Sequence, residues 1–164
     1  MAEYSVFRDV IKAQVEIVAG TGNVHSHLPY AADQRAILQK FMTTIDGVQQ
    51  LRGWWVERQQ RRVAEAEFDT QGSLNWSHVF IIVGVMSFRD ATDTDATFGN
   101  MIDDVIDSLA LMTNRPTDFM SGVWQIVPPR LRVQELRMIG DVLCHYAEII
   151  LIPHKTTDYR ASGS

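Results

Sequence analysis

The sequence of 164 residues has one cysteine, no excess of positive charge and no long apolar run. A single cysteine can form neither an internal disulfide nor a cysteine-rich zinc site, so packing must hold the fold. The net charge of −5 argues against a protein that grips nucleic acid through its phosphates, but leaves room for a local basic patch. The longest apolar runs, HVFIIVGVMSF and EIILI, are too short for a membrane-spanning helix.

Catalytic motifs are also missing: the chain has no P-loop, no G-x-G-x-x-G, no G-x-S-x-G and no Cys-x-x-Cys. The acidic stretch from Asp90 to Asp95 fails the calcium-loop pattern, because Asp95 stands at the sixth position and Met101 at the twelfth. We therefore expect no enzyme and no cofactor. The N-terminus has no basic segment followed by an apolar one, so we expect no signal peptide and an intracellular, soluble protein.

Apolar residues make up 46% of the chain, which is enough for one globular domain. Spacings of three and four predict amphipathic helices over 4–18 and 97–114, and more weakly over 33–45, where Asp33 caps the start. The β-branched segment TTID at the end of the third range favours extended chain.

Strands are predicted over 51–69 and 76–88, which form a long hairpin, and then over 122–127, 131–139 and 141–152. Strands grouped with strands favour an α+β fold: a mostly antiparallel sheet with a long hairpin, flanked by two to three helices on one face. We expect a single domain over 1–154 and a flexible C-terminal tail over 155–164.

Cys144 and His145 stand side by side, but neighbours on a strand point to opposite faces and cannot form a catalytic pair. We expect Cys144 to be a small buried residue and His145 a core or interface histidine. The strand is apolar on both faces, and so is the stretch from Val79 to Phe88. Helices can cover one face of the sheet, and we expect a neighbouring subunit to cover part of the other.

Adjacent Trp54 and Trp55 also point opposite ways, so we expect one in the core and one available to a partner. Arg58 and Arg61 follow in a polar stretch typical of a solvated hairpin. Aromatic residues and arginine dominate interface energetics. Together with strand 141–152, these considerations give a list of candidate interface residues: Trp54, Trp55, Arg58, Arg61, Tyr146 and Glu148. Trp55→Ala is expected to weaken assembly more than folding.

Four segments follow one another in an order that resembles tail terminators and head–tail joining (neck) proteins of long-tailed bacteriophages. They are VHSHLPYAADQRAILQKFM, GVQQLRGWWVERQQ, TFGNMIDDVIDSLA and GDVLCHYAEIILIP. The resemblance covers residues 4–154, and its most specific pieces are Val24-His25, Gly53-Trp54 with Arg58, and Leu143 to Glu148.

The resemblance implies a structural subunit with no enzymatic activity, in a homo-oligomeric ring that is usually a hexamer. Such a ring caps the tail tube and joins it to the head completion or connector protein, and DNA passes through its lumen without specific binding. It implies a place in the tail or neck of the virion, reached from the host cytoplasm during assembly, and no membrane partner.

Two alternatives of other classes stay open. One is a small-molecule or metal-binding α+β module that uses His25, His27 or His145, although His25-Ser26-His27 lacks an indicated third zinc ligand. The other is an adaptor that pairs an exposed strand edge with another chain.

Overall fold

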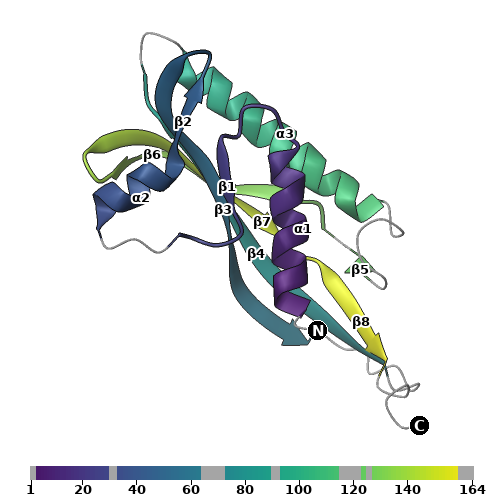
Figure 1. Ribbon diagram of the computed structural model, residues 1–164. Helices are drawn as coiled ribbons and strands as arrows, with labels where there is room; N and C mark the ends of the chain where they lie inside the picture. The colour runs from purple at the N-terminus through teal and green to yellow at the C-terminus, as the bar shows by residue number, and fades with distance from the viewer. Residues whose placement is uncertain are drawn as a thin grey trace.

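The computed structural model (Figure 1) describes most of the chain, in six ranges: 3–29, 33–63, 73–89, 93–114, 123–124 and 127–158. Within these ranges three helices and a mostly antiparallel sheet form an α+β fold, which confirms the predicted fold class. None of the helices in these ranges has the length and apolar character needed to cross a membrane.

The three helices lie where the apolar periodicity predicts them: α1 (Glu3–Glu16), α2 (Gln34–Phe41) and α3 (Thr94–Asn114). The side chain of Asp33 caps α2 by accepting a hydrogen bond of 2.8 Å from the backbone N–H of Ala36. At Met42 the chain turns extended as strand β2 (Met42–Ile45), as its β-branched residues favour. Helix α3 starts three residues before the predicted Thr97.

The sheet has a main path of five strands in the order β1-β3-β4-β7-β6. Their bounds are β1 (Asn23–His25), β3 (Val48–Val63), β4 (Ser73–Ser87), β6 (Arg130–Ile139) and β7 (Val142–Leu151). Neighbours on this path run antiparallel except β1, which pairs parallel with β3. Strand β2 makes a hairpin with β3 through the turn at Asp46-Gly47, where both residues have positive φ.

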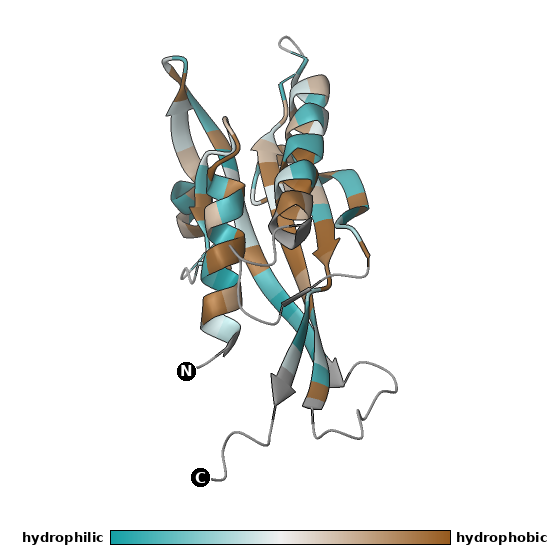
Figure 2. Ribbon diagram, turned by 90° about the vertical axis from the view of Figure 1, so that its right-hand side faces the viewer, coloured by the Kyte–Doolittle hydropathy of each residue, from teal (hydrophilic) through white to brown (hydrophobic). Residues whose placement is uncertain are grey.

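Strands β3 and β4 form the predicted long hairpin, and they continue beyond the body of the molecule as an arm (Figure 1). The hydropathy colouring changes from mostly apolar in the body to mostly hydrophilic along this arm (Figure 2). Strand β8 (His154–Asp158) pairs with the first half of β4, and the short β5 (Val123–Trp124) pairs with β8. Of the strand predicted over 122–127, the structure describes β5 and Val127, and the other residues lie outside the described ranges.

Strand β8 corrects the prediction of a flexible tail over 155–164. Residues 155–158 are part of the sheet, paired with Ser73 to Trp76 of β4. The two adjacent threonines, Thr156 and Thr157, suit an extended backbone, and β4 supplies an edge that β7 leaves uncovered. Residues 159–164 lie outside the described ranges.

Helices α1 and α3 cover one face of the sheet, as predicted. Their apolar stripes pack on Trp54, Phe80 and Ile149 of three neighbouring strands, and these side chains are fully buried. On α3 the buried stripe consists of Phe98, Met101, Ile102, Val105 and Leu109, as the spacing predicts; the side chain of Met112 lies outside the description. We call this side of the sheet the helical face.

Helix α2 of the same chain covers part of the opposite face, and the expectation of a neighbouring subunit over the rest stays a prediction. Leu38 and Phe41 of α2 pack on this face, where Ile81, Val83 and Val85 of β4 are buried. Partly buried apolar side chains of β6 and β7 pack against the same cluster: Val133, Ile139, Val142 and Ile150. The short helix α2 is therefore the cover of this core within the described chain, and β6 and β7 extend the sheet beside it.

Candidate functional site

Both candidate tryptophans lie inside the fold. Trp54 is fully buried on the helical face, where its ring lies 6.1 Å from that of Phe98. Trp55 is 8% exposed on the other face, packs on Phe41 and donates its ring N–H to a carboxylate oxygen of Glu57. The two rings do point opposite ways, but the expectation that one is available to a partner is wrong, because α2 covers Trp55.

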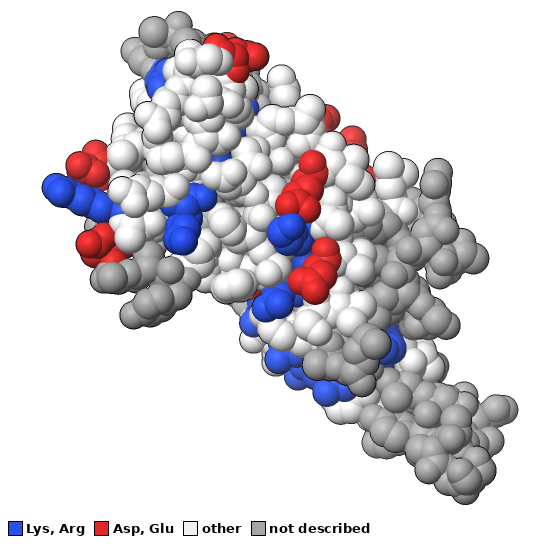
Figure 3. Space-filling view, in the orientation of Figure 1, with Lys and Arg blue, Asp and Glu red and all other residues white. Residues whose placement is uncertain are grey.

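Arg58 and Arg61 are exposed on β3 and lie over aromatic rings. The Arg58 guanidinium is 4.2 Å from the centre of the Tyr4 ring, and that of Arg61 is 4.0 Å from the centre of the Trp76 ring. The space-filling view shows basic atoms gathered where β3 passes beneath α1 (Figure 3). Through these cation–π contacts Arg58 links β3 to α1 and Arg61 links β3 to β4 in the arm, and both side chains are exposed.

Tyr146 and Glu148 lie on the face opposite the helices, next to β6. The buried Tyr146 donates its hydroxyl to Glu148 Oε1 over 2.7 Å. Burial, together with this bond, raises the pKa of Tyr146 to about 12. Two arginines of β6 complete the cluster: Arg137 lies over the Tyr146 ring, and Arg132 Nε is 3.6 Å from Glu148 Oε2. This cluster holds β6 against β7. Its most exposed members are the two arginines, so these are the side chains that a partner could contact.

The exposed apolar side chains near these residues were not among the candidate interface residues chosen from the sequence. They are four side chains of β6 and β7, which we call the β6 surface: Leu131, Leu136, Met138 and Leu143. Met138 pairs with Leu143, and Leu136 pairs with His145, which stacks on Phe98 of α3. Directly paired residues share a face, so the β6 surface lies on the helical face.

The β6 surface begins where the cover of α1 and α3 ends. His145 is 4% exposed, whereas its partner across the ladder, Leu136, is 51% exposed. The alternation Leu136-Arg137-Met138 could have pointed to this surface from the sequence. Such alternation indicates that one side of the strand is apolar, but not whether another part of the chain covers that side. Leu136, Met138 and Leu143 are neighbours on this face, and exposed apolar patches on soluble proteins often mark binding sites.

The backbone of β6 is also open to a partner. Among the described strands β6 pairs with β7 alone, so its outer edge presents unpaired N–H and C=O groups. The strand carries Arg130, Arg132 and Arg137 against one acid, Glu135, for a net charge of +2. Arg137 and Glu135 form an exposed ion pair with each other.

The outer side of α3 has the opposite charge. The helix contains Asp95, Asp103, Asp104 and Asp107 and no lysine or arginine, for a net charge of −4. All four carboxylates belong to exposed residues, as the sequence predicts for the last three. One chain thus carries an apolar, basic strand edge and a separate acidic helix surface.

The three candidate histidines do not converge. His25 on β1 packs its ring edge-on to Phe41, on the face that α2 covers, while His145 lies on the helical face. His27 is exposed in the chain after β1. Across the described ranges no three His, Cys, Asp or Glu side chains are grouped to hold a metal ion.

Cys144 and His145 point to opposite faces, as predicted. Burial raises the pKa of the Cys144 thiol to about 11, so it stays protonated and unreactive at neutral pH. Burial lowers the pKa of His145, an effect that the Asp95 carboxylate at 3.8 Å opposes. Its Nε2 lies 2.9 Å from the hydroxyl of Thr94, so His145 is a core histidine with a hydrogen-bond partner.

No protein-family model matches this chain, and the search of curated proteins finds no match either.

Proposed function

We propose that this chain is a structural subunit that assembles with copies of itself into a ring. The observation that carries the proposal is the β6 surface, an exposed apolar stripe on a strand whose outer edge has no partner in the described chain. An edge of this kind promotes association unless a neighbour covers it.

The occupant that the charges favour is a second copy of the chain. The basic β6 edge of one subunit complements the acidic surface of α3 on another. The two surfaces differ, so the contact is heterologous. Such a contact forms a closed ring when its rotation divides a full turn, and an open filament otherwise; we propose the closed form. The arginines lie on the face of β6 opposite Leu136 and Met138, so a contact that also covers these two side chains must wrap around the strand edge.

The resemblance to tail terminators and head–tail joining proteins gives this ring its place. In that role it is a virion component that caps the tail tube, contacts the head completion protein and lets DNA pass, without catalysing a reaction. The net charge of −5 suits a lumen that must not retain DNA.

The test is the particle mass by light scattering after size exclusion at several concentrations, followed by negative-stain imaging. We expect rings with a central hole for the native chain, and smaller particles for the double variant Leu136→Glu, Met138→Glu. Glutamate at these exposed positions leaves the core intact, so the variant should keep its thermal unfolding midpoint within a few degrees.

The control is Ile17→Glu, which places one glutamate, against two in the β6 variant, on an exposed apolar residue outside β6. It should leave the rings unchanged. A native chain that is monomeric at every concentration, or a control that disrupts rings as strongly as the β6 variant, would contradict the proposal.

A further inference from the structure

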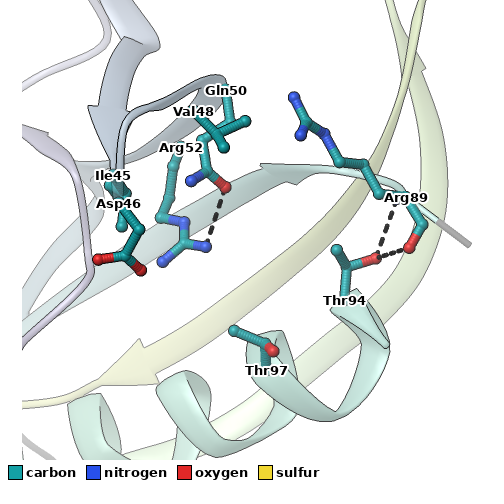
Figure 4. Close-up of a pocket in the computed structure, with 8 residues that line it drawn as sticks. All are labelled: Ile45, Asp46, Val48, Gln50, Arg52, Arg89, Thr94 and Thr97. Carbon is teal, nitrogen blue, oxygen red and sulfur yellow. Dashed lines mark hydrogen bonds between the residues drawn. The ribbon is translucent and has the colours of Figure 1, made fainter. Parts of the chain in front are cut away.

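A cavity of about 310 Å³ lies between the β2–β3 turn and the first turn of α3. Figure 4 shows Arg52 and Gln50 of β3 on one side of it and Thr94 and Thr97 of α3 on the other. None of these residues belongs to the β6 surface. The volume is at the lower end of the range for small-molecule sites.

Of the three charged residues that line this cavity, Asp46 and Arg89 are exposed and Arg52 is buried, at 8% exposed. Its Nη1 donates to the carbonyl of Gly20 over 2.9 Å, and its Nη2 donates to Gln50 Oε1 over 3.0 Å. Both acceptors are neutral. Its buried Nε has no hydrogen-bond partner in the described structure.

The positive charge of Arg52 is not neutralised at close range. It takes part in no ion pair within the described ranges, and Asp46, which also lines the cavity, acts on it only through its longer-range field. Buried charges in proteins are normally paired or bound to a counter-ion. The guanidinium retains N–H donors beyond those that Gly20 and Gln50 use.

The opposite wall is the first turn of α3, where the carboxylate of Asp93 already accepts from the backbone N–H of Ala96. The buried Thr94 opens α3, whose N-terminal end carries a partial positive charge. Its hydroxyl accepts from the backbone N–H of Arg89, and the Arg89 side chain is tied to the carbonyl of Gln49 over 2.8 Å. A second cation is thereby held at the cavity mouth.

We propose that this cavity binds a single carboxylate group attached to a short apolar body. Arg52 would hold the carboxylate, and Ile45 and Val48 supply apolar wall for the body. Asp46 at the same cavity repels a second negative charge, so a doubly charged phosphate fits less well. The carboxylate can come from a free small acid or from an acidic side chain of another chain.

The probe is butyrate, titrated into the full chain and followed by amide chemical shifts. We expect saturable shifts confined to the β2–β3 turn and the first turn of α3, and at least about tenfold weaker binding in Arg52→Gln. Phosphate should bind more weakly than butyrate. Thr97→Val, on an exposed residue of the wall, gives a second variant in case Arg52→Gln does not fold, and it should also weaken binding.

Unsaturable shifts, shifts spread over the whole surface, or phosphate binding as tight as that of butyrate would overturn the proposal. So would unchanged butyrate binding in both variants. The source of the carboxylate is read from self-association: butyrate lowers it if the site takes an acidic side chain of a second copy, and leaves it unchanged if the site takes a free acid. Either effect on self-association is interpreted only after the titration has shown that butyrate binds.

Discussion

Two strands of the sheet, β3 and β6, show opposite relations to solvent. Six consecutive residues of β3, Leu51 to Val56, are buried, with side chains on both faces of the sheet. On β6 only Val133 and Ile139 are even partly buried. A strand buried on both faces contributes to the stability of the single chain, whereas a strand exposed on both faces is free to contact another molecule. Substitutions in β3 should therefore change folding, and substitutions in β6 should change association.

The largest expected effect is that of Trp55→Ala. Removing this buried ring leaves a cavity against Phe41, so the free energy of unfolding should fall by about 3–5 kcal/mol. Leu136→Ala on β6 should change it by less than about 0.5 kcal/mol. Urea unfolding followed by tryptophan fluorescence and by circular dichroism measures both. Equal losses in the two variants would remove the distinction between the strands.

Gly84→Ala tests the packing of β3 on its neighbour. A Cβ at Gly84 would lie 2.5 Å from the ring of Trp54, which is fully buried and has little room to move. We expect a loss of about 1–3 kcal/mol in the free energy of unfolding. The control is Gly99→Ala on α3, where nothing lies within 4 Å of the added Cβ. That change should stabilise the chain slightly, because alanine favours helix. A stable Gly84→Ala variant would show that the core between β3 and β4 is looser than these contacts indicate.

The sequence predicted β3 better than β6 for a physical reason. Helix periodicity and strand composition depend on neighbours along the chain, so the helices, the long hairpin and the burial of Cys144 could be predicted. Which strand lies at the edge depends on contacts between distant segments. One of Trp54 and Trp55 was expected to face a partner because the sequence does not show that α2 covers Trp55. Leu136 was not selected because alternation alone does not show where the cover of α3 ends. The pairing of β8 with β4 was missed because a short polar strand carries little pattern.

His145 lies at the boundary between the covered and exposed parts of the sheet and gives a prediction about pH. Burial lowers its pKa below the ordinary 6.5, so the folded chain holds it neutral and the unfolded chain takes up its proton first. Its contribution to stability is complete above pH 6.5 and is lost as the pH falls through the lowered pKa of the folded state. In His145→Gln the free energy of unfolding should depend less on pH in this window. Exposed His27→Gln serves as the control, and an unchanged pH dependence in His145→Gln would contradict the assignment.

The smallest expected effect is that of Arg61→Met, on the outer, polar half of β3. The substitution keeps the apolar stem over Trp76 and removes the charge, so the cation–π part of the contact is lost. For an exposed pair this is worth about 0.5–1 kcal/mol. Arg61 was also a candidate interface residue, so urea unfolding and particle mass should be measured on the same sample. If Arg61 only stabilises the arm, the unfolding midpoint moves slightly and the particle mass stays unchanged. A loss of association at nearly unchanged stability would mean that the outer half of β3 belongs with β6, as a surface that neighbours contact.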